Sequence, residues 1–371
     1  MRIVVAPDKF KGSLTALEVA RAVAAGIAAA HPHAQVRLVP LADGGDGTVD
    51  AAVAAGYDHV PVTVAGPTGD PVVAAYARRG ESAVVELANA CGLSLLPAGV
   101  PAPLDASSFG LGQVLAAALD AGARSVVLGV GGSASTDGGA GMLQALGARL
   151  LDARGAEIAR GGRGLAEVAG LDLAGLAGRL TGVRVDLAGD VDNPLLGPFG
   201  AAAVYGPQKG ADADDVRRLD DALARWADIV AATVGVDRSG EPGAGAAGGV
   251  GFAALSLLGA HRRPGVDIVA EVVGLTAALR GADLVVTGEG SLDEQTLHGK
   301  TVAGVSRLAG SLGVPVVAVA GRVQLDAAQQ RRLGLERTIG LTDLEPDPRR
   351  CIAEAGRLVT DAAERLLRTG P

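Results

Sequence analysis

Apolar and polar positions alternate in blocks over the first fifty residues. Residues 2–6 form a β-branched run that is typical of a buried strand, and residues 36–39 form a second one. Between them, Thr15 and Glu18 have the spacing of a capping box, which predicts a helix that runs through Ala30. This alternation of strands, polar loops and helices predicts a parallel sheet whose loops meet at one edge.

The pattern changes near residue 60. Two extended segments, 60–65 and 72–76, flank the turn sequence GPTGD at residues 66–70 and predict a hairpin. We therefore expect an α/β protein with two α/β domains. Residues 1–66 plus 281–371 would form a Rossmann- or flavodoxin-like domain with a parallel sheet. A second α/β domain would be inserted at residues 67–280, with the active site in the cleft between the two domains.

The later periodic segments continue this alternation. In the inserted part, apolar runs predict strands at residues 83–87, 125–130 and 183–187, and helical periodicity predicts helices at residues 107–121, 142–151 and 214–232. Beyond the insert, the pattern predicts strands at residues 284–286 and 314–320, a helix that begins at Thr301, and a C-terminal helix at residues 349–368.

Composition narrows the possible partners. A net charge of −8 over 371 residues argues against nucleic acid or an anionic membrane as the main partner. The two cysteines suit a reducing cytosol and offer no zinc site, and the chain does not start with a signal peptide. The uncharged span 242–260 is too rich in Gly and Ala for a membrane helix. We expect a cytoplasmic protein, and the sequence leaves monomer and homodimer both open.

Lysine is rare in this chain. Only four of the 33 basic residues are lysines, and all four lie in polar turns that contain Gly or Pro: Lys9, Lys11, Lys209 and Lys300. A chain that otherwise uses arginine is expected to keep lysine where a compact, mobile ammonium is needed. The alternative is that these are ordinary surface lysines.

The segment at residues 282–300, ADLVVTGEGSLDEQTLHGK, gathers many chemical groups into one loop. A short buried strand is followed by Glu289, Ser291, Asp293, Gln295 and Lys300. In a parallel α/β sheet, the loop from the carboxyl end of a strand to the next helix is where ligands bind. Its end resembles a P-loop, but position 294 holds Glu where that motif needs Gly, so a Walker A motif is rejected. The alternative is an ordinary solvated loop.

A second loop, GGSASTDGGAG at residues 131–141, is dense in glycine and hydroxyl groups. Gly131, Gly132 and Ser133 would let backbone N–H groups approach an anion, and Asp137 could hold a metal or a hydroxyl. The loop lacks the G-x-G-x-x-G order of a dinucleotide fingerprint. Tight helix packing is the alternative explanation for its glycines.

Three acidic pairs also follow predicted strands: Asp43 with Asp46, Asp190 with Asp192, and Glu289 with Asp293. Phosphoryl transfer needs Mg²⁺ held by carboxylates, cations near the developing charge, and a carboxylate that accepts the hydroxyl proton. Acidic pairs, rare lysines and a glycine loop meet these needs together, although a lone acidic pair is more often a helix cap or a turn.

Six blocks of the chain together resemble the bacterial glycerate kinase family. They are APDKFKGSL at 6–14, ADGGDGT at 42–48, GVGGSASTDGGAGML at 129–143, DVDNPL at 190–195, VYGPQKGA at 204–211 and TGEGSLDEQTLHGK at 287–300. The blocks occur in order along nearly the whole chain. The resemblance implies ATP-dependent phosphorylation of D-glycerate with Mg²⁺, and it favours 2-phosphoglycerate as the product.

Roles for single residues are hypotheses from their chemistry. Lys9, Lys11 and Lys300 are expected to bind phosphate or the glycerate carboxylate, with Lys9 and Lys300 counted as catalytic. Asp190 or Asp293 is the candidate base, and Glu289 or Asp190 the candidate metal ligand. The other expected binding residues are Asp8, Ser13, Asp43, Asp46, Gly131, Gly132, Ser133, Asp137, Asp192, Asn193, Lys209, Ser291 and Gln295.

Other functions remain open at this level. Phosphorylation could occur at the 3-hydroxyl of glycerate or on another small hydroxy acid. A dehydrogenase would need a dinucleotide fingerprint, which is missing. The non-enzymatic alternative is a binding protein that senses a small acid.

Overall fold

The computed structural model describes residues 1–368, except for the side chain of His298. It divides into two compact units. Unit 1 comprises Met1–Asp43, Asp50–Gly56 and the chain from Val266 onward, and unit 2 comprises Gly44–Val49 and Tyr57–Gly265. Unit 2 takes in the whole hairpin that the sequence pattern would have divided at residue 66, because its two strands pair with each other along their length.

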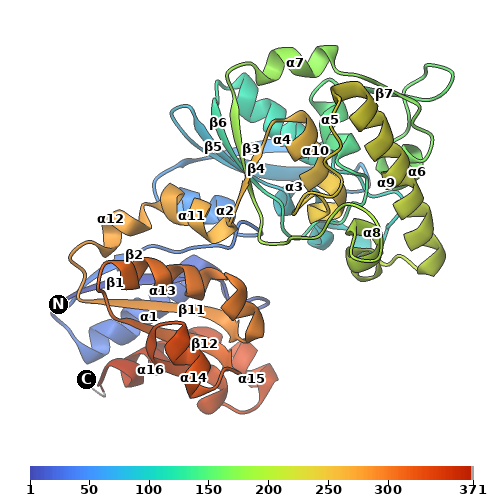
Figure 1. Ribbon diagram of the computed structural model, residues 1–371. Coiled ribbons are helices and arrows are strands. Elements are labelled where there is room, and N and C mark those ends of the chain that lie inside the picture. Colours follow the sequence, from blue (N-terminus) through green and yellow to red (C-terminus); the bar gives the residue numbers. More distant parts are fainter. Residues whose placement is uncertain (369–371) are drawn as a thin grey trace. The chain divides into compact units, whose positions relative to one another are not determined.

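Unit 1 is built on a five-stranded sheet with the order β13-β12-β11-β1-β2, in which all neighbours are parallel (Figure 1). The parallel sheet predicted from the strand–helix alternation is thus confirmed. Its strands are β1 (Arg2–Pro7), β2 (Gln35–Leu38), β11 (Leu284–Leu292), β12 (Val316–Val323) and β13 (Leu335–Gly340). Its helices and 3-10 turns are α1 (Ala16–Ala30), α2 (Thr48–Ala54), α11 (Gly265–Val273), α12 (Leu275–Leu279), η5 (Glu294–His298), α13 (Thr301–Ser311), α14 (Ala327–Arg332), η6 (Leu341–Asp343), α15 (Pro348–Ala353) and α16 (Ala355–Arg368).

The strands of this sheet are buried on both faces, which explains their continuous apolar runs. Ile3 and Val5 point to the face covered by α1 and α16. Val4 and Ala6 point to the opposite face, which α11, α12 and α13 cover. Helices α1 and α16 lie so close that a Cβ atom at Gly26 would come within 2.4 Å of the Thr360 carbonyl oxygen.

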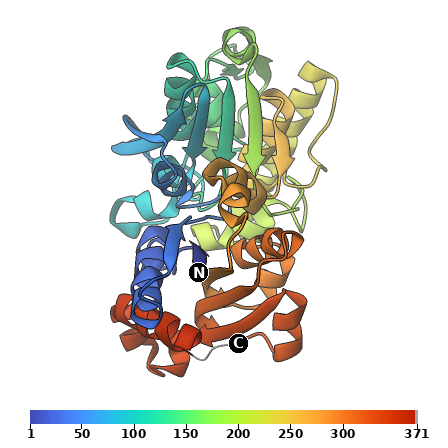
Figure 2. The same ribbon diagram turned by 90° about the vertical axis from the view of Figure 1, so that its left-hand side faces the viewer.

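Unit 2 contains a six-stranded sheet with the order β10-β9-β6-β5-β4-β3 and a small two-stranded sheet, β7-β8. Figure 2 shows the strands of the larger sheet lying side by side, in blue to green and yellow. The pairs β3–β4 and β4–β5 are antiparallel and the others in that sheet are parallel. Its strands are β3 (Asp58–Ala65), β4 (Pro71–Arg79), β5 (Ser82–Glu86), β6 (Ser125–Gly129), β9 (Arg184–Ala188) and β10 (His261–Arg263), with β7 (Arg149–Leu151) and β8 (Gly170–Asp172) in the small sheet.

The helices of unit 2 pack with these strands around one apolar core that contains the fully buried Trp226. They are α3 (Ala88–Cys91), α4 (Phe109–Asp120), α5 (Ala140–Ala145), α6 (Gly161–Leu165), α7 (Ala174–Leu180), α8 (Ala201–Tyr205), α9 (Ala213–Val234) and α10 (Val250–Leu257). Short 3-10 turns are η1 (Leu93–Leu95), η2 (Pro97–Gly99), η3 (Pro207–Lys209) and η4 (Ala246–Gly249). Both cysteines of the chain are free and buried.

Three local predictions need correction. The helix expected at residues 142–151 ends at Ala145, and residues 149–151 form β7 instead. The C-terminal helix is broken between α15 and α16. The strand expected at residues 284–286 continues to Leu292, because β11 keeps pairing with β12 beyond its apolar run. The polar segment is therefore strand as far as Leu292, and not a loop from its first charged residue.

Candidate functional site

The carboxyl ends of β1 and β11 form one edge of the unit 1 sheet. The two strands are parallel neighbours with Pro7 opposite Gly288, so the residues that follow β1 lie beside Glu289 of β11. The Asp8 N–H group continues the ladder by donating to the Gly288 carbonyl at 2.8 Å. The two polar segments that the sequence analysis singled out after β1 and within residues 282–300 therefore lie side by side. We call Asp8, Lys9, Glu289 and Lys300 the acidic edge.

Asp8 is a buried carboxylate with few donors around it. Its Oδ1 accepts the Lys9 backbone N–H at 2.6 Å and lies 3.9 Å from Lys9 Nζ. Its Oδ2 accepts the Thr301 hydroxyl at 2.7 Å. Burial raises the pKa of Asp8 to about 6; Lys9 opposes the shift and Asp43 adds to it. Asp8 thus changes its charge close to neutral pH.

Glu289 is likewise a buried carboxylate with a raised pKa. Its side chain is buried, and Oε1 accepts the Thr296 hydroxyl. Burial raises the pKa of Glu289 to about 7; Thr296 and Lys300 oppose the shift, whereas Asp8 and Asp293 add to it. Two carboxylates that repel each other, each near a lysine, form a site that a cation or a proton would stabilise.

The remaining predicted residues of unit 1 are more exposed. Lys300 is half-buried at the N-cap of α13, and Lys11 is exposed. Asp293 caps η5 by accepting the Gln295 N–H at 3.0 Å. An open hollow of about 460 Å³ lies beside that turn and is lined by Asp293, Glu294, Gln295, Gln324 and Gln329.

Two predicted hydroxyls of unit 1 have local partners. Ser291 Oγ lies 3.4 Å from Gln324 Oε1. Ser13 donates to the Phe10 carbonyl at 3.0 Å and so closes the turn that carries Lys11.

In unit 2, Asp137 lies at the centre of the loop at residues 131–141. It is fully buried and accepts five hydrogen bonds: from Ser107 Oγ at 3.2 Å, Ser108 N at 2.7 Å, Ser108 Oγ at 2.9 Å, Gly139 N at 3.2 Å and Gly141 N at 3.3 Å. The backbone N–H groups of Gly139 and Gly141, at the start of α5, thus face a carboxylate of the chain itself. Asp137 holds the loop together.

Lys209 supports the same loop. Its side chain is buried, and Nζ donates to the Ser135 carbonyl at 2.5 Å and lies 3.3 Å from Thr136 Oγ1. Burial lowers the pKa of Lys209 to about 8, although Asp137 and Cys91 favour its charged form. Ser133 is buried as well and accepts the Ser135 N–H at 3.1 Å. Of the predicted cradle, Gly131 and Gly132 remain partly or fully exposed.

The loop ADGGDGT contributes its glycine part to unit 2. Glu86, at the end of β5, accepts the N–H groups of Gly47 at 3.1 Å and Val49 at 3.0 Å. Gly45 passes so close to the loop at 131–141 that a Cβ at Gly131 would lie 2.6 Å from its Cα. Asp46 is exposed and Asp43, in unit 1, is half-buried.

The polar residues that follow β9, Asp190 to Asn193, form hydrogen bonds and an ion pair with nearby residues of unit 2. Asp190 accepts the Gly265 N–H at 2.8 Å, and Asp192 pairs with Arg262 at 2.5 Å. Asn193 accepts from the Tyr205 hydroxyl at 2.7 Å and donates to the Phe199 carbonyl at 2.8 Å. Asn193 therefore braces this loop, whereas Asp190 remains exposed.

The sequence analysis did not predict four side chains that make hydrogen bonds in these sites: Thr296, Thr301, Ser108 and Glu86. Thr301 had one local signal, since it follows Lys300 at the start of a predicted helix. The partners of the other three lie 7, 29 and 37–39 residues away along the chain. No spacing rule links such positions, so only the fold reveals them.

The described residues hold no group of three or more His, Cys, Asp or Glu side chains arranged to bind a metal by themselves. Within the same part of the chain, none of the helices combines the length and the apolar character needed to span a bilayer.

Comparisons with known proteins extend over nearly the whole chain. Residues 3–370 match the family model described as the glycerate kinase family. A glycerate kinase of Bacillus subtilis (strain 168) is 46% identical over 339 residues, which cover 91% of this chain and 89% of the relative. A glycerate 2-kinase of Escherichia coli (strain K12) is 42% identical over 341 residues, with 91% and 89% covered. A crystal structure of a Salmonella typhimurium LT2 protein assigned as glycerate kinase 2 has a TM-score of 0.87 and 43% identity, and covers 100% of this chain and 98% of that one.

Proposed function

Because the chain belongs to the glycerate kinase family, we propose that it transfers the terminal phosphoryl group of ATP to the 2-hydroxyl of D-glycerate and releases 2-phosphoglycerate. The observation that carries this proposal is the acidic edge, where buried Asp8 and Glu289 lie with Lys9 and Lys300. Phosphoryl transfer depends on placing positive charge on phosphoryl oxygens and a proton acceptor near the attacking hydroxyl.

We assign the lysines to the anionic groups of the substrates. Lys9 and Lys300 would neutralise charge that develops on the transferred phosphoryl group, and exposed Lys11 would hold a phosphate or the glycerate carboxylate. Lys300 occupies the N-cap position of α13, whose first N–H groups add partial positive charge at the same place.

Three carboxylates compete for the role of proton acceptor. Asp190 is exposed, and its Oδ1 accepts the Gly265 backbone N–H at 2.8 Å. Asp293 is already used as a cap. Asp8 joins these two because its pKa of about 6 lies near the working pH, where a general base is most effective. We keep Asp190 as the first candidate and Asp8 as its rival.

The donor set fits magnesium. Mg²⁺ prefers carboxylate oxygens and is usually held by one or two of them together with substrate phosphates, so a preformed group of three is not required. Glu289 would hold the ion, with Asp43 of the same unit as a further candidate ligand. When bound, Mg²⁺ neutralises charge on the nucleotide phosphates. We also propose a cytoplasmic location, because the two free cysteines suit a reducing compartment.

The test is ³¹P NMR of the protein with MgATP and D-glycerate, beside a sample that lacks glycerate. A new phosphomonoester signal coupled to the single C2 proton is expected. Coupling to a CH₂ group would instead identify a 3-kinase. If ATP stays intact with glycerate present, the substrate is wrong and other small hydroxy acids are the next to try.

A further inference from the structure

A second hollow, of about 250 Å³, opens in unit 1. It is lined by Arg2 and Val4 of β1, Gln35 and Arg37 of β2, and Ala277 and Ala278 of α12. Arg2 and Gln35 begin their strands, whereas the acidic edge lies where β1 ends, beside Glu289 in the second half of β11. None of its lining residues belongs to the proposed catalytic set.

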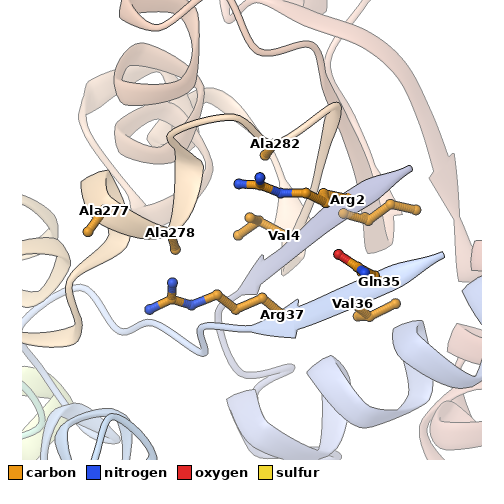
Figure 3. A pocket seen from close by; sticks show the side chains of 9 residues that line it. Arg2, Val4, Gln35, Val36, Arg37, Ala277, Ala278 and Ala282 are labelled. Atoms are coloured by element: carbon orange, nitrogen blue, oxygen red, sulfur yellow. The ribbon is translucent and has the colours of Figure 1, made fainter.

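The strand register places both arginines on one face of the sheet. Arg2 is opposite Gln35 and Val4 is opposite Arg37, so the two guanidinium-bearing side chains lie on the same side of neighbouring strands, two positions apart. Figure 3 shows both side chains extending in the same direction, toward the helix that carries Ala277 and Ala278.

The positive charge of this hollow is only partly compensated. Arg2 Nη2 donates to the Arg280 carbonyl at 2.9 Å, which leaves other N–H groups of its fork available. Arg37 is exposed, and its guanidinium has neither a hydrogen bond nor an ion pair to any described residue. No carboxylate lines the hollow. The nearby Asp283 accepts the Arg2 backbone N–H at 2.6 Å and lies 3.9 Å from the terminal amine of Met1.

We propose that this hollow binds a small anion with two acidic groups, of the class of phosphorylated short-chain carboxylic acids. Guanidinium forks match phosphate and carboxylate oxygens in pairs, and Gln35 adds an amide donor. The volume equals that of about eight water molecules, which suits a three-carbon acid and is below the usual size of sites for larger ligands. In a chain with a net charge of −8, a basic hollow whose lining contains no carboxylate selects against cations and favours anions.

Backbone amide NMR tests the proposal with inorganic phosphate as the first probe and 2-phosphoglycerate as the second. Titration of the wild-type protein is expected to shift the amide signals of Val4, Val36 and Ala278 in a saturable way that added NaCl weakens. Binding of 2-phosphoglycerate should be at least several-fold tighter than that of phosphate, because a second acidic group is engaged.

Variants separate this hollow from any other anion site. Arg37→Gln should abolish the saturable shifts and leave turnover unchanged, whereas Arg21→Gln, which changes an exposed arginine of α1 outside the hollow, should keep both. The proposal is overturned if the three amides do not move at the highest soluble ligand concentration, or if their shifts persist in Arg37→Gln.

Discussion

Unit 1 buries Asp8 and Glu289 with few donors around them, whereas unit 2 buries Asp137 inside a shell of five hydrogen bonds. Beside Asp137, buried Lys209 donates to the backbone of the same loop. In unit 1, burial raises the pKa values of both carboxylates toward neutrality. Burial of a carboxylate therefore has two different consequences. With many hydrogen bonds it makes a rigid loop, and with few it leaves a group that can exchange protons or bind a cation.

The largest expected effect concerns the proton acceptor. Asp190→Asn should leave the fold intact and lower turnover roughly 10²–10⁴-fold, because an amide cannot take the hydroxyl proton. Steady-state kinetics at saturating MgATP and D-glycerate measure this. Asp8→Asn is the matched rival in the acidic edge. If Asp190→Asn keeps near-normal turnover and Asp8→Asn loses most of it, Asp8 of unit 1 is the proton acceptor. That result would also strengthen the contrast between the reactive carboxylates of unit 1 and the structural Asp137 of unit 2.

The next effect concerns the stability of unit 2. Asp137→Ala should lower its unfolding free energy by about 3–5 kcal/mol, because the donors around the carboxylate lose their acceptor and the buried Lys209 loses a favourable negative charge nearby. Trp226 fluorescence during denaturation by urea reports on this unit. Asp192→Ala is the control and should cost less than about 1 kcal/mol, because the Asp192 side chain is largely exposed. Equal losses in the two variants would remove the distinction drawn for Asp137.

Removal of the Asp8 charge from the acidic edge should raise the unfolding free energy of unit 1, whereas Asp137→Ala lowers that of unit 2. The pKa of Asp8 is raised on folding from 3.8 to about 6, so the folded state binds more protons than the unfolded state between these values, and stability falls as pH rises through this window. At pH 8, Asp8→Asn should therefore stabilise unit 1 by about 2–3 kcal/mol. The gain should vanish near pH 4, where Asp8 is protonated in the folded state. Hydrogen exchange of the β1 amides at the two pH values measures the change, and a destabilised variant at pH 8 would contradict it.

The smallest effect concerns Lys209. Its pKa falls on folding from 10.5 to about 8, so the unfolded state binds more protons in this window and stability rises with pH. Unit 2 should gain about 1 kcal/mol between pH 8 and pH 9. Lys209→Met should remove most of this gain, as measured by urea denaturation followed through Trp226. An unchanged pH slope in the variant would show that Lys209 is charged in both states.

The sequence predicted local features of the fold well. The capping box at Thr15 and Glu18 is confirmed, and the strand ending before Asp8 is right to within one residue, since both depend on neighbours in the chain. The helix expected at 142–151 was wrong in its second half, because pairing of β7 with β8 overrides the local helical periodicity there. Pairing between strands that are far apart in the chain cannot be recognised from the periodicity of a short stretch of sequence.

The candidate site was predictable in residue type but not in environment. The sequence predicted Glu289 as a metal ligand and Asp8 and Asp137 as binding residues, because all three follow predicted strands. Which of them would be satisfied depends on partners such as Thr301, which is 293 residues from Asp8, and Ser108, which is 29 residues from Asp137. Burial and hydrogen bonding are properties of the fold, so no local pattern separates the self-satisfied Asp137 from Asp8 and Glu289.

The pairing of β1 with β11 also has a consequence for synthesis on the ribosome. Ile3 lies opposite Leu284, so the first strand of the chain has no partner on that side until 281 more residues have been made. At the usual rates of translation this takes roughly 15–55 s. Unit 2, by contrast, is almost continuous in sequence and can complete its sheet earlier. During that interval the β11 side of the apolar first strand is open to chaperones and to other nascent chains. It is covered only when β11, in the final third of the chain, has been made.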